Sequence, residues 1–140
     1  MTTPIVTSQA PDAKPVGLSR SASTDWQVIV EAPEYEVPQQ TFGGGTDIVS
    51  GVAEIISPLL VSNIGASTAS ISVRVFRGTA NTYFTILNAL PVPTNDMIGI
   101  PLNGQFIYAG DTLEVQASSN NALDVTISYT VGQAEEDDVV

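Results

Sequence analysis

The sequence predicts an all-β protein, a single antiparallel β-sandwich of jelly-roll or Greek-key type with about seven or eight strands. Apolar and polar residues alternate with period two through much of the chain, which is the pattern of strands with one buried face. Turn-forming residues recur every ~8–12 residues, and no stretch has the apolar spacing of an amphipathic helix. A chain of 140 residues fits one such domain rather than two.

The strands are predicted where the alternation is clearest. In residues 123–131, Leu123, Val125 and Ile127 are separated by polar residues, so their side chains should share one dry face. In chain order the predicted strands cover residues 26–31, 54–62, 70–76, 83–88, 97–102, 111–118 and 123–131. The segments between them contain strand-breaking residues, among them Pro33, Pro38, Gly43 to Gly45, Pro91, Pro93, Asn103-Gly104 and Gly110-Asp111.

The two ends of the chain lack this alternation. Residues 1–24 combine three prolines with small polar residues and are predicted to form an extended N-terminal arm. Residues 133–140 contain four consecutive acids, Glu135 to Asp138, and are predicted to form a short acidic tail. The sandwich domain is therefore expected to span residues 25–132.

Charge and composition exclude several classes of function. The formal net charge is −11, and no Lys or Arg follows Arg77, so binding to nucleic acid or to an anionic membrane is not expected. The absence of Cys and His rules out thiol and imidazole nucleophiles, disulfides and zinc sites built on those side chains. With no apolar run of membrane-spanning length and no signal-peptide pattern, we expect synthesis in the cytoplasm.

Four acids of the predicted sandwich are the candidates for catalysis or metal binding: Asp96, Asp111, Glu114 and Asp124. A carboxylate pair can hydrolyse glycosides, but these residues lie in turns or at polar strand positions, where solvated side chains are expected. Oxygen-rich spots at Asn95-Asp96, at Asn103, or at Asn120-Asn121 with Asp124 leave a Ca²⁺ site open, although their spacing matches no known calcium loop. The sequence therefore predicts no catalytic residue, no cofactor and no metal site.

The four cations, Lys14, Arg20, Arg74 and Arg77, are the candidate interface residues. Arg74 and Arg77 flank Phe76, and their guanidinium groups favour a carboxylate partner, either within the chain or on a neighbouring subunit; a solvated strand face is the alternative. Trp26, Tyr83 and Tyr108 are the aromatic residues available for stacking on a sugar if the domain binds glycans. The other aromatic residues are expected in the core or at its rim.

A resemblance to a known class of proteins rests on the order of short sequence motifs between Pro58 and Val131. Leu90-Pro91-Val92-Pro93, then Ala109-Gly110-Asp111-Thr112-Leu113, then Leu123-Asp124-Val125 follow an Asn/Ser turn and a Val-rich strand. In this order the segment resembles small β-sandwich virion proteins of tailed bacteriophages. The resemblance covers a little over half of the chain and consists of turns and hydrophobic phase rather than catalytic residues.

The resemblance implies a non-enzymatic structural component of a phage virion, most simply a capsid decoration or cement protein. A neck, tail or fibre-base accessory protein, or a glycan- or receptor-binding module, is the alternative. The expected partners are other virion proteins, such as the major capsid protein or a neck or tail protein. The arm, which has no core of its own, predicts a homo-oligomer, with a trimer favoured.

Overall fold

The computed structural model describes residues 14–38 and 45–133 and confirms the all-β sandwich. These residues form eleven strands in two antiparallel sheets. The strands are β1 (Lys14–Ser21), β2 (Gln27–Glu31), β3 (Glu34–Pro38), β4 (Thr46–Ile55), β5 (Leu59–Asn63), β6 (Ala69–Arg77), β7 (Thr82–Val92), β8 (Met97–Ile100), β9 (Phe106–Ile107), β10 (Thr112–Ala117) and β11 (Leu123–Gln133). The described residues contain no helix that could span a bilayer.

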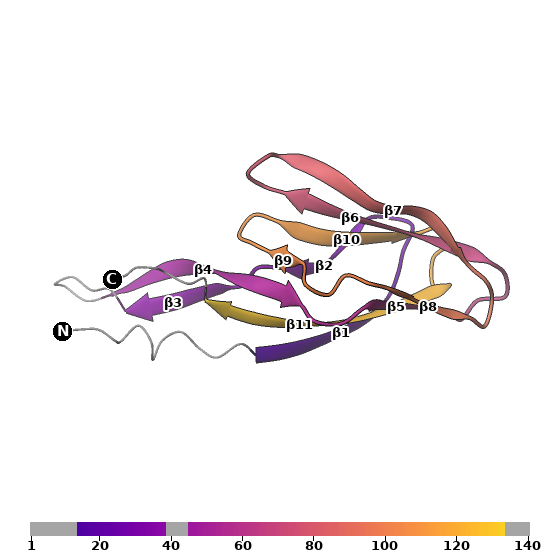
Figure 1. Cartoon of the computed structure of the whole chain (residues 1–140), viewed down its shortest axis with the longest axis horizontal. Helices are drawn as coiled ribbons and strands as arrows, with labels where there is room; N and C mark the ends of the chain where they lie inside the picture. Colours follow the sequence, from indigo (N-terminus) through magenta and orange to yellow (C-terminus); the bar gives the residue numbers. More distant parts are fainter. Residues whose placement is uncertain (1–13, 39–44, 134–140) are drawn as a thin grey trace.

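The strand pairs are nested, which identifies the topology as a jelly roll. β1 pairs with β11, β2 with β10, β4 and β5 with β9 and β8, and β6 with β7, all antiparallel. One sheet has the order β2-β10-β6-β7, and the other contains the path β3-β4-β11-β5-β8 with β1 and β9 attached to it. A double-stranded ribbon folded over on itself produces this arrangement, in which both sheets meet through their inner faces. Figure 1 shows the two layers, with β6, β7 and β10 in the upper one.

The core between the sheets is entirely apolar at its centre. Its largest fully buried side chains come from six strands and are those of Ile55, Leu59, Ile71, Ile107, Leu113, Leu123 and Ile127. The predicted phase of β11 is confirmed, because Leu123, Val125 and Ile127 are all buried. In β2, the neighbours Ile29 and Val30 are both buried because the register with β10 shifts at this point, so that Leu113 lies opposite Val30 and Glu114 opposite Val28.

The part of the predicted N-terminal arm that the structure describes is not free. Lys14–Ser21 forms strand β1, which pairs with β11 along its whole length, and the side chain of Leu18 packs against the core. Ala22 is buried and donates its backbone N–H to the Leu123 carbonyl at 2.8 Å. Residues Lys14–Ser21 are extended, as predicted for the arm, but the prediction that the sandwich begins only at residue 25 is wrong, because β1 belongs to one of its sheets. Pro15 is tolerated because β1 lies at a sheet edge. Residues 1–13 lie outside the described residues, as does the tail after residue 133.

All seven predicted strands differ from the structure by at least one residue at an end, and two of them differ most. The predicted strand 54–62 is divided into β4 and β5 at residues 56–58, where Pro58 has no N–H to donate. Across this gap Ile56 N–H donates to the Ser128 carbonyl, and Ser128 N–H donates to Ser57 Oγ. The predicted strand 83–88 extends through Pro91 to Val92, because β7 is an edge strand in which a missing N–H is tolerated.

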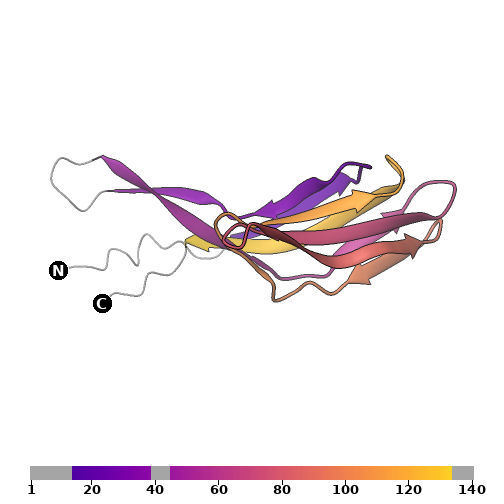
Figure 2. The same ribbon diagram turned by 90° about the horizontal axis from the view of Figure 1, so that it is seen from above.

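A two-stranded ribbon projects beyond the sandwich and was not predicted. β3 pairs only with the first half of β4, from Glu34 opposite Ser50 to Pro38 opposite Thr46. Figure 2 shows this ribbon leaving the two-layered body and twisting away from it. The prolines at its ends had favoured a turn here, but they occupy the start and end of an edge strand.

Candidate interaction surface

Arg74 lies at the centre of the outer face of the four-stranded sheet. Its guanidinium carbon lies 3.9 Å from the centroid of the Trp26 ring and 3.8 Å from that of Tyr83. Its Nε donates to Glu114 Oε1 at 2.8 Å, because β6 and β10 place Arg74 and Glu114 directly opposite each other. Thr112 Oγ1 donates to the second Glu114 oxygen at 2.9 Å. We call Trp26, Arg74, Tyr83 and Glu114 the Arg74 cluster.

The cluster is fixed by cross-strand geometry. Tyr83 of β7 lies opposite Phe76 of β6, and the two ring centroids are 4.9 Å apart at an interplanar angle of 51°. Guanidinium groups stack on aromatic faces and pair with carboxylates at the same time, which a Lys side chain cannot do in the same geometry. Arg74 therefore holds three strands of the outer face together.

Arg77 and Asp111 form a second ion pair at the end of the sandwich. Arg77 Nη1 donates to Asp111 Oδ2 at 2.9 Å and also to the Phe106 carbonyl at 3.0 Å. Asp111 is 6% exposed, and its Oδ1 accepts the Gly78 N–H at 2.9 Å. Gly78 is required here, because a Cβ on it would lie 2.6 Å from the Gly110 carbonyl oxygen. The pair thus joins the β6–β7 turn to the loop between β9 and β10.

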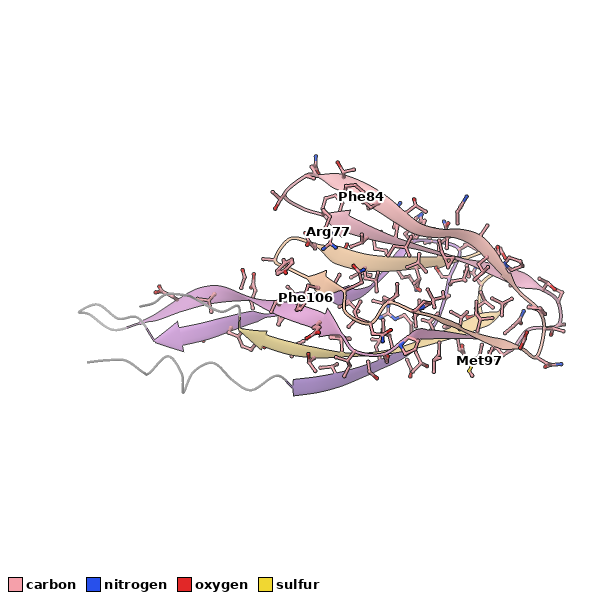
Figure 3. All side chains as sticks on the ribbon, viewed as in Figure 1. Arg77, Phe84, Met97 and Phe106 are labelled. Carbon is pink, nitrogen blue, oxygen red and sulfur yellow. The ribbon has the colours of Figure 1, made fainter. Side chains whose placement is uncertain are left out.

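Two aromatic side chains are presented beside this ion pair. Phe106 and Tyr108 stack with centroids 5.9 Å apart at an interplanar angle of 18°, and they remain 40% and 54% exposed. The Asp111 N–H donates a hydrogen bond to the Tyr108 carbonyl at 2.9 Å, which connects the backbone of Tyr108 to this ion pair. Figure 3 shows Phe84, Arg77 and Phe106 along one side of the molecule, with Met97 far from them. We call the stacked residues the Phe106–Tyr108 pair.

The structure decides between the alternatives for the two sandwich arginines. Arg74 and Arg77 both have carboxylate partners within the chain, so a solvated face is wrong for both. The expectation of solvated side chains for Asp111 and Glu114 is also wrong, because both are buried by the arginines they bind. The sequence could not reveal this, since Glu114 occupies a polar position of an alternating strand and its partner depends on the register with β6.

The remaining predicted site residues lie apart from these clusters. Arg20 is exposed and its Nη1 lies 3.4 Å from the Val28 carbonyl, whereas Lys14 begins β1 and its side chain lies outside the described part of the structure. Asp124 accepts a hydrogen bond from Ser21 at 2.9 Å, and Asp96 Oδ1 accepts the Met97 N–H at 2.9 Å.

Three of the side chains considered for calcium binding accept hydrogen bonds within the chain. Asn120 Oδ1 accepts the Thr24 N–H at 2.9 Å, while Asp96 and Asp124 have the partners given above. Within residues 14–38 and 45–133, no three Asp or Glu side chains gather as a group that could hold a metal ion.

Exposed apolar residues on β7 are a feature that the sequence did not single out. Phe84 lies opposite the buried Val75 and so faces the inner side of its sheet, yet it is 49% exposed. Ile86 and Tyr83 on the same strand are also exposed. The available signal was the lack of a charged residue anywhere in Thr82–Val92.

Comparison with known proteins adds little to this description. No protein-family model matches the chain, and no curated protein matches it. Among solved structures, the CBM22-1 xylan-binding domain of Xyn10C from Paenibacillus barcinonensis superposes with a TM-score of 0.34 at 16% identity, over 85% of this chain and 94% of that domain.

Proposed function

We propose that this chain is a non-enzymatic structural component of a tailed-phage virion, with capsid decoration as its leading role. Attachment to the neck, the tail or the fibre base would be the same structural function at another position on the virion. The proposal combines the order of short sequence motifs, which resembles that of phage virion proteins, with the jelly-roll fold. This fold occurs in viral structural proteins and in lectins alike. The acidic net charge of −11 favours protein partners over nucleic acid.

The observation that carries the proposal is the exposure of the Phe106–Tyr108 pair on a rigid support. Aromatic side chains are enriched in the buried centres of protein interfaces, where a few of them supply most of the binding energy. Here the backbone beneath the pair is held by the Arg77–Asp111 ion pair, so little conformational entropy is lost when a partner covers the rings. We assign the contact with the particle to this end of the sandwich.

The first experiment is mass spectrometry of particles purified by density gradient from the source of the gene. The chain is expected in the particles at high copy. Its presence in the lysate together with its absence from the particles would contradict the proposal.

A second experiment tests the attachment surface with particles that lack the chain. The double variant Phe106→Ser, Tyr108→Ser should bind at least about tenfold more weakly than the original sequence, as expected for loss of interface anchors. Met97→Ser is the matched control, because Met97 is also an exposed apolar residue but lies far from the pair (Figure 3). Equal binding by all three proteins would place the contact elsewhere.

Glycan binding is the second candidate function, and the Arg74 cluster is the observation that favours it. Trp26 and Tyr83 form an aromatic surface on an outer sheet face, and such surfaces stack on sugar rings. The Arg74 guanidinium already covers one face of each ring, which leaves less aromatic surface for a ligand. Binding on a glycan array that is lost in Trp26→Ala but retained in the Phe106→Ser, Tyr108→Ser variant would favour this function over virion attachment.

A further inference from the structure

The edge strands of the two sheets differ in how they are protected from pairing with another chain. β2, β8 and β9 are short, with five, four and two residues. β1 contains Lys14, Pro15 and Arg20, and β3 contains two glutamates and a proline. Short length, charge and proline are the usual protections of an edge strand. β7 has eleven residues and no charged residue, and its one proline, Pro91, is the second-last residue of the strand.

The unprotected part of β7 is its first half. Thr82 to Ile86 are all exposed, and Tyr83, Phe84 and Ile86 are respectively 50%, 49% and 39% accessible. The register with β6 shifts between Thr85 and Leu87, where Ile86 has no partner on β6, and Ala89 has a φ of 56°, so the strand is irregular from Ile86 toward Val92. A second strand can therefore pair in regular register with Thr82 to Thr85 only.

Charge indicates what the second strand is. Each copy carries −11, so two copies repel each other wherever acidic surfaces meet. Residues 55–95 contain no Asp or Glu and include Arg74 and Arg77, and β7 lies within this range. Because residues 55–95 contribute no carboxylate, two copies can approach each other along the edge of β7 with less repulsion than along an acidic surface.

We propose that two copies of this chain associate through antiparallel pairing of their β7 strands, with Phe84 opposite Phe84 on a two-fold axis. In this register Tyr83 of each copy lies opposite Thr85 of the other. The pairing joins two four-stranded sheets into one continuous sheet and brings exposed apolar side chains together. It is isologous and gives a dimer, in place of the trimer that the sequence favoured. It does not depend on the proposed virion role, since it concerns the purified protein alone.

The association is measured by sedimentation velocity on the full chain at about 100 μM, where a contact of micromolar Kd is well populated. We expect a dimer. Phe84→Lys and Phe84→Glu should each raise the Kd by at least about tenfold, because like charges would face each other on the axis. An equimolar mixture of these two variants should form a dimer again, which only a self-opposed residue can produce. Met97→Lys, at an exposed apolar position far from Phe84 (Figure 3), should leave the Kd unchanged.

A cross-link provides a second test that does not rely on weakening the contact. The chain contains no cysteine, so Phe84→Cys introduces a single thiol per copy. Oxidation should give a covalent dimer with high yield, because directly opposed residues in an antiparallel pair have a Cα separation within the range of a disulfide. Met97→Cys should give little. A monomeric original sequence, a trimer, or a dimer that Phe84→Lys leaves intact while circular dichroism shows it folded would overturn the proposal.

Discussion

Arg77 Nη1 lies 2.9 Å from Asp111 Oδ2, so one ion pair fastens the β6–β7 turn to the loop that precedes β10. The same carboxylate accepts the Gly78 N–H, and the same guanidinium nitrogen donates to the Phe106 carbonyl. Because Asp111 is buried, these contacts replace the water that a carboxylate would otherwise bind. This end of the sandwich is therefore held by polar contacts in addition to the apolar core, to which Ile107 and Leu113 belong.

Removal of the Asp111 charge should destabilise the fold. Asp111→Asn weakens the ion pair and leaves the Arg77 guanidinium without its counter-ion, so we expect the free energy of unfolding to fall by about 2–4 kcal/mol. Urea denaturation followed by the fluorescence of Trp26 measures this change. In a double-mutant cycle with Arg77→Met, a coupling energy near zero would show that the two residues act independently.

Replacement of Arg74 by lysine keeps the charge but removes the planar group between two rings. We expect Arg74→Lys to lower the free energy of unfolding by about 1–2 kcal/mol and to shift the emission of Trp26, whose ring lies against the guanidinium. Arg20→Lys is the matched control, because Arg20 is exposed and contacts only a distant carbonyl, and its effect should stay within about 0.5 kcal/mol. Equal effects of both substitutions would argue against the stacking.

Gly78 should not tolerate a side chain. A Cβ at this position would lie 2.6 Å from Gly110 O and 2.9 Å from Gly110 C, and backbone atoms cannot move aside as a flexible side chain can. Gly78→Ala should therefore cost about 1–3 kcal/mol in urea denaturation. Gly17→Ala tests the same substitution in β1, where nothing lies within 4 Å, and it should be neutral or stabilising by up to about 1 kcal/mol.

Stability should fall in alkaline solution through Tyr129. Burial, and to a lesser extent the charge of Glu31, raise the pKa of the Tyr129 phenol above its ordinary value of 10.0. Below pH 10 the phenol is neutral in both states, whereas above it the unfolded chain ionises first, so stability is lost as the pH rises. The loss should be smaller in Tyr129→Phe, and Glu31→Gln should lower the pKa of Tyr129. Denaturation curves between about pH 9 and 11 measure this, and identical profiles for all three proteins would contradict it.

Association of copies should strengthen with salt. The charge of −11 per copy causes repulsion that is screened as the Debye length falls from about 30 Å at 10 mM salt to about 8 Å at physiological ionic strength. Sedimentation at about 10 and 150 mM NaCl should show a lower Kd at the higher concentration. Association that weakens with salt would instead point to attraction between arginines and carboxylates of different copies.

The sequence predicted the fold class and the phase of the central strands because alternation reports directly which side chains face the core. Leu123, Val125 and Ile127 illustrate this, since their spacing alone places them on one buried face. The pairing of strands that lie far apart in the chain cannot be predicted from this alternation. The partner of Glu114 is set by the register between β10 and β6, and the inclusion of Lys14–Ser21 in a sheet is set by β11 more than a hundred residues away.

The nested strand pairs have a consequence for the order in which the protein folds on the ribosome. β1 is synthesised early, but its partner β11 is the last described strand, and β11 also supplies the edges along which β4 and β5 pair. The central hairpin of β6 and β7 can form as soon as it emerges, whereas the larger sheet has to await the synthesis of β11. A nascent chain arrested before residue 123 should therefore remain sensitive to protease in β1, β4 and β5.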